Sequence, residues 1–210
     1  MVEIIPAIIG IDFLEVKEKI SRLEGLVDWA QLDIMDGVFT SEYSWQRPGD
    51  LETLDGKVKL EAHLMVRDPE DLIDEWLVVC DRVIIHPEST MQLGEILEKV
   101  NQSSTEASLS ILMDTPLEKL DSFINQVKSV QLMGIATIGH HGEPLDRRVY
   151  DRIKFLRTQY PGVKISVDGG VNLNNAQELI GAGADRLVVG SAIWQSNDIE
   201  NTINALRRKN

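Results

Sequence analysis

Eight short apolar segments alternate with amphipathic segments along the chain. The apolar segments are nearly continuous in Val, Ile and Leu, which is the pattern of parallel strands buried on both faces. They are Glu3–Ile9, Trp29–Ile34, Lys59–Met65, Arg82–His86, Ala107–Leu112, Ser129–Ala136, Lys164–Val167 and Arg186–Gly190. The predicted helices between them are Phe13–Leu26, Leu51–Leu54, Pro69–Val79, Met91–Val100, Pro116–Val127, Arg147–Tyr160, Asn174–Gly181 and Ile199–Arg208.

Eight strand-helix units in 210 residues predict an α/β fold, a single (β/α)8 TIM barrel that occupies residues 1–210 as one domain. Pro69 and Pro116 indicate the first turns of two helices, with Asp68 and Thr115 as expected N-caps. An open, doubly wound sheet is the alternative. It is disfavoured because no G-x-G-x-x-G follows the first strand, where a dinucleotide site requires it.

Composition excludes some partners and compartments. The formal net charge of -13 disfavours nucleic acid and anionic membrane surfaces. The single cysteine, Cys80, has no partner within the chain for a disulfide, which favours a reducing compartment. No apolar stretch approaches the roughly 18 residues of a membrane span, and no basic leader precedes the first strand. We therefore expect a cytoplasmic protein.

Three of the predicted strands end on a side chain that can do chemistry. Asp33 lies at the end of the second strand, His63 at the end of the third and Asp168 at the end of the seventh. In a barrel these ends gather around one mouth, which is where TIM-barrel enzymes place their active sites. Two carboxylates on opposite sides of a small ligand suit proton transfer between the two faces of a carbon next to a carbonyl. A divalent cation held by the same groups would offset the repulsion between the carboxylates.

The last two predicted strands are followed by glycine-rich turns. Gly169 and Gly170 follow the seventh strand, and Gly190 and Ser191 follow the eighth. Backbone N–H groups of such turns bind phosphate in many barrels. The loop after the sixth strand, residues 137–144, contains Gly142 and is a candidate lid over the same ligand.

At these motifs the chain resembles ribulose-phosphate 3-epimerases, over nearly its whole length. The shared segments are Ile5–Ile8, Leu32–Gly37, His63–Val66, Val167–Val171 and Val189–Ile193. The resemblance implies a ribulose-phosphate-binding barrel that interconverts D-ribulose 5-phosphate and D-xylulose 5-phosphate in the pentose phosphate pathway. It further implies that Asp33 and Asp168 are acid and base around one divalent metal ion. By motif position, His63 is a further metal ligand, and Met35 and Met65 line the substrate side of the site.

Three departures from the family pattern concern the metal, the site floor and the lid. Gln31 stands where the family has a metal-binding histidine, so Zn or Fe should bind more weakly, Mn or Mg becomes relatively more plausible, and the metal is weakened or absent. Ala7 replaces a serine of the first strand. The lid segment contains His140 and His141, which could contact phosphate or assist proton transfer, although exposed loop histidines are usually only solvated.

Other functions stay open on the sequence. A 3-epimerase of another ketose phosphate, such as a hexulose 6-phosphate, would use the same proton transfer. A barrel that binds phosphorylated metabolites without turnover would need only the glycine-rich turns. The related decarboxylases and aldol-type barrels are disfavoured, because they require Asp-x-Lys-x-x-Asp at the third strand and this chain has Glu61-Ala-His there. A homo-oligomer also stays open.

Overall fold

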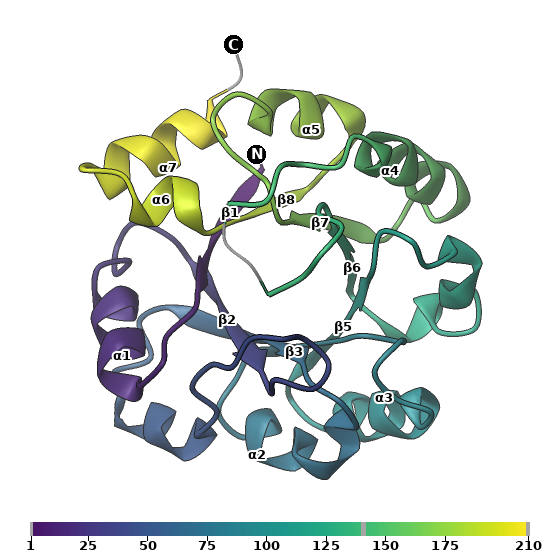
Figure 1. Cartoon of the computed structure of the whole chain (residues 1–210). Helices are drawn as coiled ribbons and strands as arrows, with labels where there is room; N and C mark the ends of the chain where they lie inside the picture. Colours follow the sequence, from purple (N-terminus) through teal and green to yellow (C-terminus); the bar gives the residue numbers. More distant parts are fainter. Residues whose placement is uncertain (1, 140–141, 209–210) are drawn as a thin grey trace.

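The computed structural model describes residues 2–139 and 142–208 and contains a closed barrel of parallel strands. Figure 1 shows the strands around a central axis with the helices outside them. Neighbouring strands follow each other in chain order, and β8 pairs with β1 to close the sheet. The strands are β1 (Glu3–Ile8), β2 (Trp29–Met35), β3 (Lys59–Met65), β4 (Arg82–Ile85), β5 (Glu106–Ile111), β6 (Ser129–Met133), β7 (Lys164–Asp168) and β8 (Arg186–Val189). The predicted TIM barrel is confirmed.

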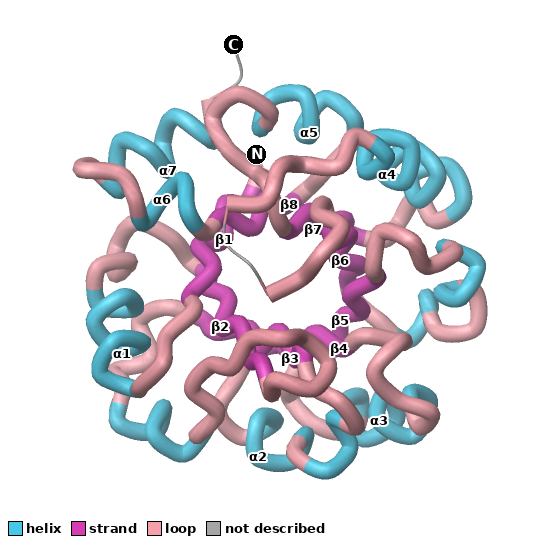
Figure 2. The backbone as a smooth tube through the Cα atoms, viewed as in Figure 1, coloured by secondary structure: helices cyan, strands magenta, loops and turns pink. Residues whose placement is uncertain are grey.

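A ring of helices and helical turns surrounds the barrel (Figure 2). The α-helices are α1 (Phe13–Ser21), α2 (Ile73–Leu77), α3 (Leu93–Asn101), α4 (Arg148–Gln159), α5 (Ala176–Ala182), α6 (Ser191–Trp194) and α7 (Ile199–Arg207). The 3-10 turns are η1 (Pro48–Thr53), η2 (Pro69–Asp71), η3 (Leu117–Leu120) and η4 (Ile124–Gln126). None of the helices in the described part of the chain is long and apolar enough to cross a membrane.

Some local expectations were wrong. The helix expected over 116–127 is two separate 3-10 turns, η3 and η4. Of the two expected N-caps, Asp68 takes that position, before η2, and Thr115 does not. Asp68 has a left-handed backbone with φ 51° and makes no capping bond, and the residue that precedes η3 is Pro116 rather than Thr115. The sixth strand is shorter than expected and ends at Met133, because the chain turns at Gly134. A side chain at Gly134 would place its Cβ 2.6 Å from the carbonyl oxygen of Gly169.

The two faces of the sheet differ in polarity. Outward-facing side chains such as Leu32, Leu64 and Val167 belong to a large apolar cluster beneath the helices. Along each strand alternate side chains face the barrel interior. Residues paired in register between β2 and β3, such as Gln31 with Glu61 and Asp33 with His63, therefore share a level. The interior is thus more polar than the branched apolar filling typical of this fold.

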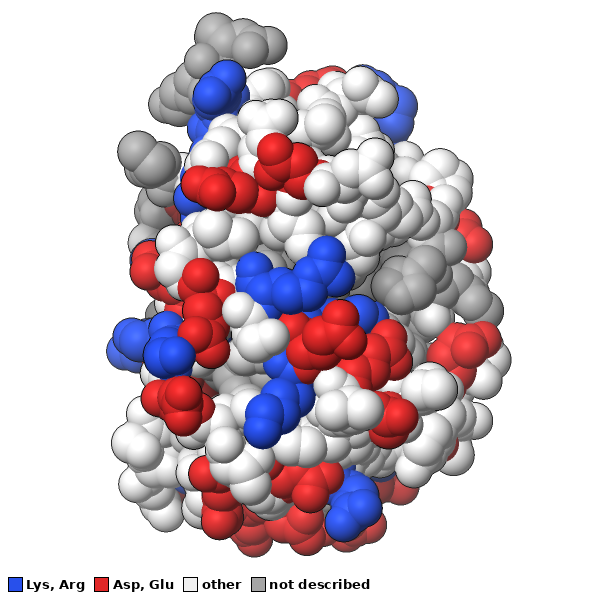
Figure 3. Space-filling view, turned by 90° about the vertical axis from the view of Figure 1, so that its left-hand side faces the viewer, with Lys and Arg blue, Asp and Glu red and all other residues white. Residues whose placement is uncertain are grey.

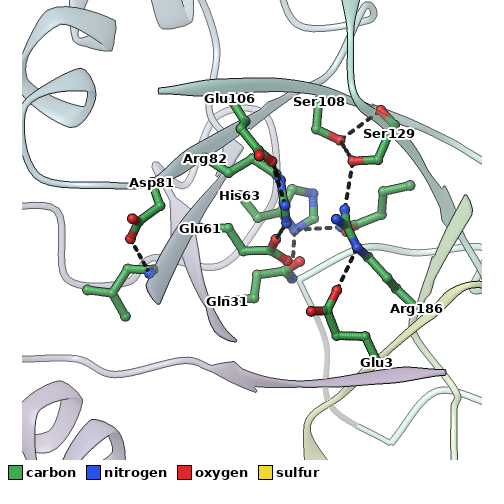
Figure 4. A network of polar contacts seen from close by, with 12 residues as sticks. Glu3, Gln31, Glu61, His63, Asp81, Arg82, Glu106, Ser108, Ser129 and Arg186 are labelled. Carbon is green, nitrogen blue, oxygen red and sulfur yellow. Dashed lines mark hydrogen bonds and ion pairs between the residues drawn. The ribbon is translucent and has the colours of Figure 1, made fainter. Parts of the chain in front are cut away.

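A charged network fills the amino-terminal end of the barrel (Figure 4). Arg82 bonds to Glu61 and lies 2.7 Å from Glu106, and its guanidinium stacks 4.0 Å from the ring centroid of Trp29. The second arginine of this network, Arg186, donates to Glu3 at 2.8 Å and to Ser129 at 3.0 Å. These ion pairs occupy the amino-terminal end of the barrel interior. A ligand therefore has access to the interior from the carboxyl-terminal mouth.

Charged side chains are mixed on the face of the molecule that Figure 3 displays. Lysine and arginine side chains lie beside acidic ones there instead of forming a continuous basic surface. Contacts such as the one between Lys19 and Glu15, at 2.6 Å on α1, are of this kind. Isolated surface pairs like these contribute little to stability.

Candidate active site

Asp33, His63 and Asp168 converge at the carboxyl-terminal ends of β2, β3 and β7. One potential ligand atom from each residue lies within 4.8 Å of the other two. Nδ1 of His63 is 3.1 Å from Oδ1 of Asp33 and 3.4 Å from Oδ2 of Asp168. Asp33 and Asp168 keep 7% and 8% of their surfaces exposed, whereas His63 is fully buried. The two carboxylates can therefore reach a ligand in the barrel mouth, while the imidazole supports them from below.

Gln31 joins the two carboxylates. Its Nε2 donates to Oδ1 of Asp33 and to Oδ2 of Asp168, each at 2.8 Å, and lies 3.3 Å from Nδ1 of His63. A second amide, from Gln131 on β6, donates to the same oxygen of Asp168 at 2.8 Å. Both glutamines are buried, and within the described residues neither Oε1 atom has a hydrogen-bond partner. Gln31 thus links the two carboxylates, and Gln131 adds a second donor to Asp168.

Burial and neighbouring charges change the protonation of this cluster. Burial raises the pKa of Asp168 to about 7, and the nearby charge of Asp33 adds to the increase. Burial lowers the pKa of His63, but the hydrogen bond and charge of Asp33, together with the charge of Asp168, outweigh it and leave this pKa raised. Asp168 can therefore carry a proton near neutral pH, which is the requirement for a general acid.

A cavity of about 60 Å³ lies directly above the carboxylates. Ala7, Asp33, Met65 and Asp168 contribute to its floor and walls. Met35 is absent from this lining and packs instead beneath the loop that follows β6, with its sulfur 3.4 Å from the position a Cβ would take at Gly139. The cavity is well below the roughly 300 Å³ of ordinary small-molecule sites. A ligand the size of a sugar phosphate therefore requires the mouth to open.

The glycine-rich turns meet at one side of the cavity. Gly169 and Gly170 after β7, Gly190 and Ser191 after β8, and Gly142 from the loop after β6 all line it. Gly170 has φ 70°, and a Cβ there would lie 2.5 Å from the backbone nitrogen of Leu145. Only glycine fits that position. The structure brings these turns and the two aspartates to one cavity, and their role in phosphate binding stays a prediction.

The described parts of the loop between β6 and α4, residues 134–139 and 142–147, extend over the barrel mouth (Figures 1 and 2). A Cβ at Gly139 would lie 3.2 Å from the side chain of Thr40 in the loop after β2, so the two loops meet above the site. Glu143 of the same loop lines the cavity. The sequence prediction for His140 and His141 falls outside the described residues.

The donor set fits a divalent cation. The buried group Asp33, His63 and Asp168 could hold a metal ion, with two carboxylate oxygens and one imidazole nitrogen as ligands. A half-turn of the Gln31 amide would exchange Nε2 for the unpaired Oε1 and direct a carbonyl oxygen at the same point. The unpaired Oε1 is therefore consistent with two states of the site. In one the amide N–H group bonds to the carboxylates, and in the other the amide oxygen binds a cation.

Sequence reasoning missed three residues of the site: Gln131, His86 and Glu143. Gln131 precedes Met133 by two positions on β6 and shares its inward face, so strand alternation could have identified it. His86 lies one residue beyond β4 and contacts His63, with 2.9 Å between the two Nε2 atoms. Glu143 had no comparable signal, because its position depends on the path of the loop.

Comparisons with known proteins match this chain to one family. Residues 3–194 match the model of the ribulose-phosphate 3 epimerase family. The chain is 26% identical to ribulose-phosphate 3-epimerase of Schizosaccharomyces pombe, covering 98% of this chain and 92% of that protein. It is 30% identical to the enzyme of that name from Chlamydia pneumoniae, covering 98% of this chain and 94% of that one.

Solved structures support the fold. A 3-hexulose-6-phosphate synthase aligns with a TM-score of 0.73 at 15% identity, covering 98% of each chain. The enzyme of the same name from Salmonella typhimurium aligns with a TM-score of 0.72 at 14% identity, covering 97% of this chain and 96% of that chain. At these identities the likeness concerns the barrel alone. The family model and the curated relatives carry the assignment, and the chain belongs to the ribulose-phosphate 3-epimerase family.

Proposed function

We propose that this protein is a 3-epimerase that interconverts D-ribulose 5-phosphate and D-xylulose 5-phosphate. The observation that carries the proposal is the pair of carboxylates, Asp33 and Asp168, each 2.8 Å from a single amide nitrogen at the barrel mouth. Epimerisation at a carbon beside a ketone requires one base and one acid on opposite faces of that carbon. The two aspartates come from β2 and β7 and can flank a substrate on two sides.

The proposed reaction transfers one proton in each half. One aspartate accepts the proton from C3, and the electron pair of the broken C–H bond moves toward the C2 carbonyl to form an enediolate. The opposite aspartate then donates a proton to the other face of C3, and the carbonyl re-forms. Since its pKa is raised to about 7, Asp168 can supply the proton, with Asp33 as its partner base. The reverse reaction exchanges the two roles.

Negative charge on the substrate oxygens requires stabilisation in the same place. A divalent cation bound by Asp33, His63 and Asp168, with Gln31 as a neutral oxygen ligand, would supply it and reduce the repulsion between the carboxylates. The amides of Gln31 and Gln131 contribute independently. Their N–H groups donate to Asp168 at 2.8 Å and stabilise its ionised form after the proton has left.

The glycine-rich side of the cavity is the proposed phosphate site. Gly169, Gly170, Gly190 and Ser191 line it, and backbone N–H groups can bind an anion without a cationic side chain. The phosphate group and C3 of the substrate would have to fit together into this one small cavity. This arrangement supports a short phosphorylated ketose, bound with its phosphate beneath the loop after β6 and its C2–C3 bond between the aspartates.

Proton exchange with solvent tests the proposal. The purified protein is incubated with pentulose and hexulose phosphates in D2O, with chelator or with added Mn2+, Zn2+ or Fe2+, and deuterium at C3 is followed by NMR. The proposal expects deuterium in ribulose 5-phosphate together with formation of xylulose 5-phosphate. Exchange restricted to a hexulose phosphate would redirect it to a different ketose. Binding without exchange under every metal condition would indicate a non-catalytic phosphometabolite-binding barrel.

A further inference from the structure

A second histidine lies behind His63, on the side away from the aspartates. His86 and His63 are both fully buried, their ring centroids are 5.1 Å apart, and their Nε2 atoms are separated by 2.9 Å. Two imidazole nitrogens at this distance share one hydrogen, so one ring donates and the other accepts. Which ring donates decides whether Nδ1 of His63 can offer a lone pair to a cation held together with Asp33 and Asp168.

The carboxylate of Glu88 lies beside His86 and indicates which of the two rings donates. Its Oε2 lies 3.6 Å from Nδ1 of His86, and within the described residues neither atom has a hydrogen-bond partner. The other carboxylate oxygen, Oε1, accepts from the backbone nitrogen of Leu112 at 3.0 Å. The pKa of Glu88 is lowered to about 2, because contacts with His86, Thr115 and Leu112 outweigh the opposing effect of burial. An ionised carboxylate has no hydrogen to give and only accepts.

We propose that Glu88 and His86 are positioning residues that keep a hydrogen on Nε2 of His63. Glu88 attracts the hydrogen of His86 to Nδ1, so Nε2 of His86 has a lone pair and accepts from Nε2 of His63. Nδ1 of the neutral His63 ring then carries a lone pair, and the amide nitrogens of Gln31 and Gln131, 3.3 and 3.4 Å away, are the donors that face it. The inference deepens the proposed function, because it assigns how the chain prepares the imidazole of the same site.

The opposite arrangement leaves a poor contact. If Nε2 of His86 carried the hydrogen, Nδ1 would direct its lone pair at the ionised Oε2 of Glu88, 3.6 Å away in a buried region. Two facing acceptors repel, burial removes the water that would separate them, and within the described residues no donor reaches either atom. Partners behind a metal-binding histidine commonly determine its tautomer and orientation in this way. Here the Glu88 carboxylate acts on the His63 ring through the His86 ring.

Nitrogen NMR reads the tautomers directly and needs neither substrate nor metal. The chain has four histidines, and the signals of two are assigned by comparing spectra of His63→Gln and His86→Gln. In the metal-free protein at alkaline pH, Nδ1 of His86 is expected to be protonated and its Nε2 unprotonated, with Nε2 of His63 protonated. A wild-type spectrum in which Nε2 of His86 carries the hydrogen would overturn the proposal.

Glu88→Gln provides a matched reversal. The backbone nitrogen of Leu112 continues to need an acceptor, so the amide oxygen of the glutamine should take the Oε1 position. The amide nitrogen then faces Nδ1 of His86 and donates to it. Both rings are expected to change tautomer, leaving the hydrogen of His63 on Nδ1. Glu98→Gln removes the same charge at an exposed position of α3 and should leave both signals unchanged. Unchanged tautomers in a folded Glu88→Gln protein would count against the relay.

Cation binding supplies a second readout. Mn2+ alone is titrated into the wild type, Glu88→Gln and Glu98→Gln, and binding is followed by calorimetry. Because partners behind a ligand change metal affinity about 10–100-fold, Glu88→Gln should bind Mn2+ more weakly by that factor and the control should not. Equal Mn2+ affinity in Glu88→Gln, with reversed tautomers, would limit the relay to orienting the ring and overturn its role toward a cation. Failure of the epimerase assay alone would leave the tautomer result intact, so the two proposals fail separately.

Discussion

Nε2 of Gln31 lies 2.8 Å from Oδ2 of Asp168, although the two residues are 137 positions apart in the chain. The bond reaches across the barrel from β2 to β7. It joins one of the proposed acid-base groups to Gln31, the position at which the family resemblance implies a metal-binding histidine, and the same nitrogen also bonds to Asp33. The Gln31 amide therefore affects both carboxylates and any cation that they bind.

Replacement of either aspartate tests the proton-transfer pair. Asp33→Asn and Asp168→Asn should each lower C3 proton exchange by about 10²–10⁴-fold, because an amide keeps the shape but cannot act as acid or base. The rate of deuterium uptake at C3 is the measurement, and retained phosphate binding is the control for an intact site. Near-full exchange in either variant would contradict the two-aspartate mechanism.

The raised pKa of Asp168 predicts a pH dependence of stability. A carboxyl whose folded-state pKa of about 7 exceeds its unfolded value binds its proton more tightly when folded. Its contribution is fully present below the unfolded pKa of about 4 and is lost as pH rises through the folded pKa. Asp168→Asn removes this dependence. In metal-free protein, its unfolding free energy should therefore increase relative to the wild type between about pH 4 and pH 7, as measured by urea unfolding.

Gln31→His tests the most consequential departure from the family pattern. The wild type is expected to be substoichiometric in zinc as purified, because a neutral amide oxygen is a weaker ligand for zinc than imidazole. The histidine variant should bind zinc more tightly. Elemental analysis and the epimerase rate under identical metal are compared with Gln31→Leu, which removes both the amide donor and the potential ligand. A fully zinc-loaded wild type that Gln31→His does not improve would show that Gln31 is no handicap.

Gly190 is the best position at which to obstruct the proposed phosphate site. Its φ is negative, at -95°, whereas Gly169 and Gly170 have positive φ and no room for a Cβ. Gly190→Ala should therefore fold and weaken binding of inorganic phosphate and of sugar phosphate, and Gly190→Val should weaken both further. Calorimetric titration gives the affinities, with Gly162→Ala, on an exposed turn, as the control. Unchanged phosphate affinity in Gly190→Val would place the anion elsewhere.

Arg82 tests the charged network below the site. Arg82 and Glu61 expose only 1% and 2% of their side chains, so Arg82→Met leaves a buried carboxylate without its partner. The expected loss is about 3–5 kcal/mol of unfolding free energy. Arg82→Met combined with Glu61→Met should recover part of it. Arg148, whose side chain is 57% exposed beside Asp114 and Asp146, is the matched control, and Arg148→Met should lower the unfolding free energy far less than Arg82→Met.

The sequence by itself determined the barrel and its principal residues. Apolar runs separated by helix-period segments required buried parallel strands, and Asp33, His63 and Asp168 were recognisable because each follows such a run. Local pattern was less informative where packing overrides it. The segment 116–127 has a helical apolar spacing, yet it forms two 3-10 turns, η3 and η4. Helical periodicity describes which side chains face the barrel and does not require a continuous helix.

Tertiary structure decided how the site residues interact. Gln131 and His86 lie on β6 and just beyond β4, far in sequence from the aspartates, and only closure of the barrel brings Gln131 to Asp168 and His86 to His63. The bridge from Gln31 to Asp168 likewise depends on closure, because β2 and β7 are separated by β1 and β8 in the sheet. Strand alternation states which side chains point inward, whereas distances across the barrel depend on strand register and tilt. The sequence therefore specified the chemical groups, and the closed sheet specified their partners.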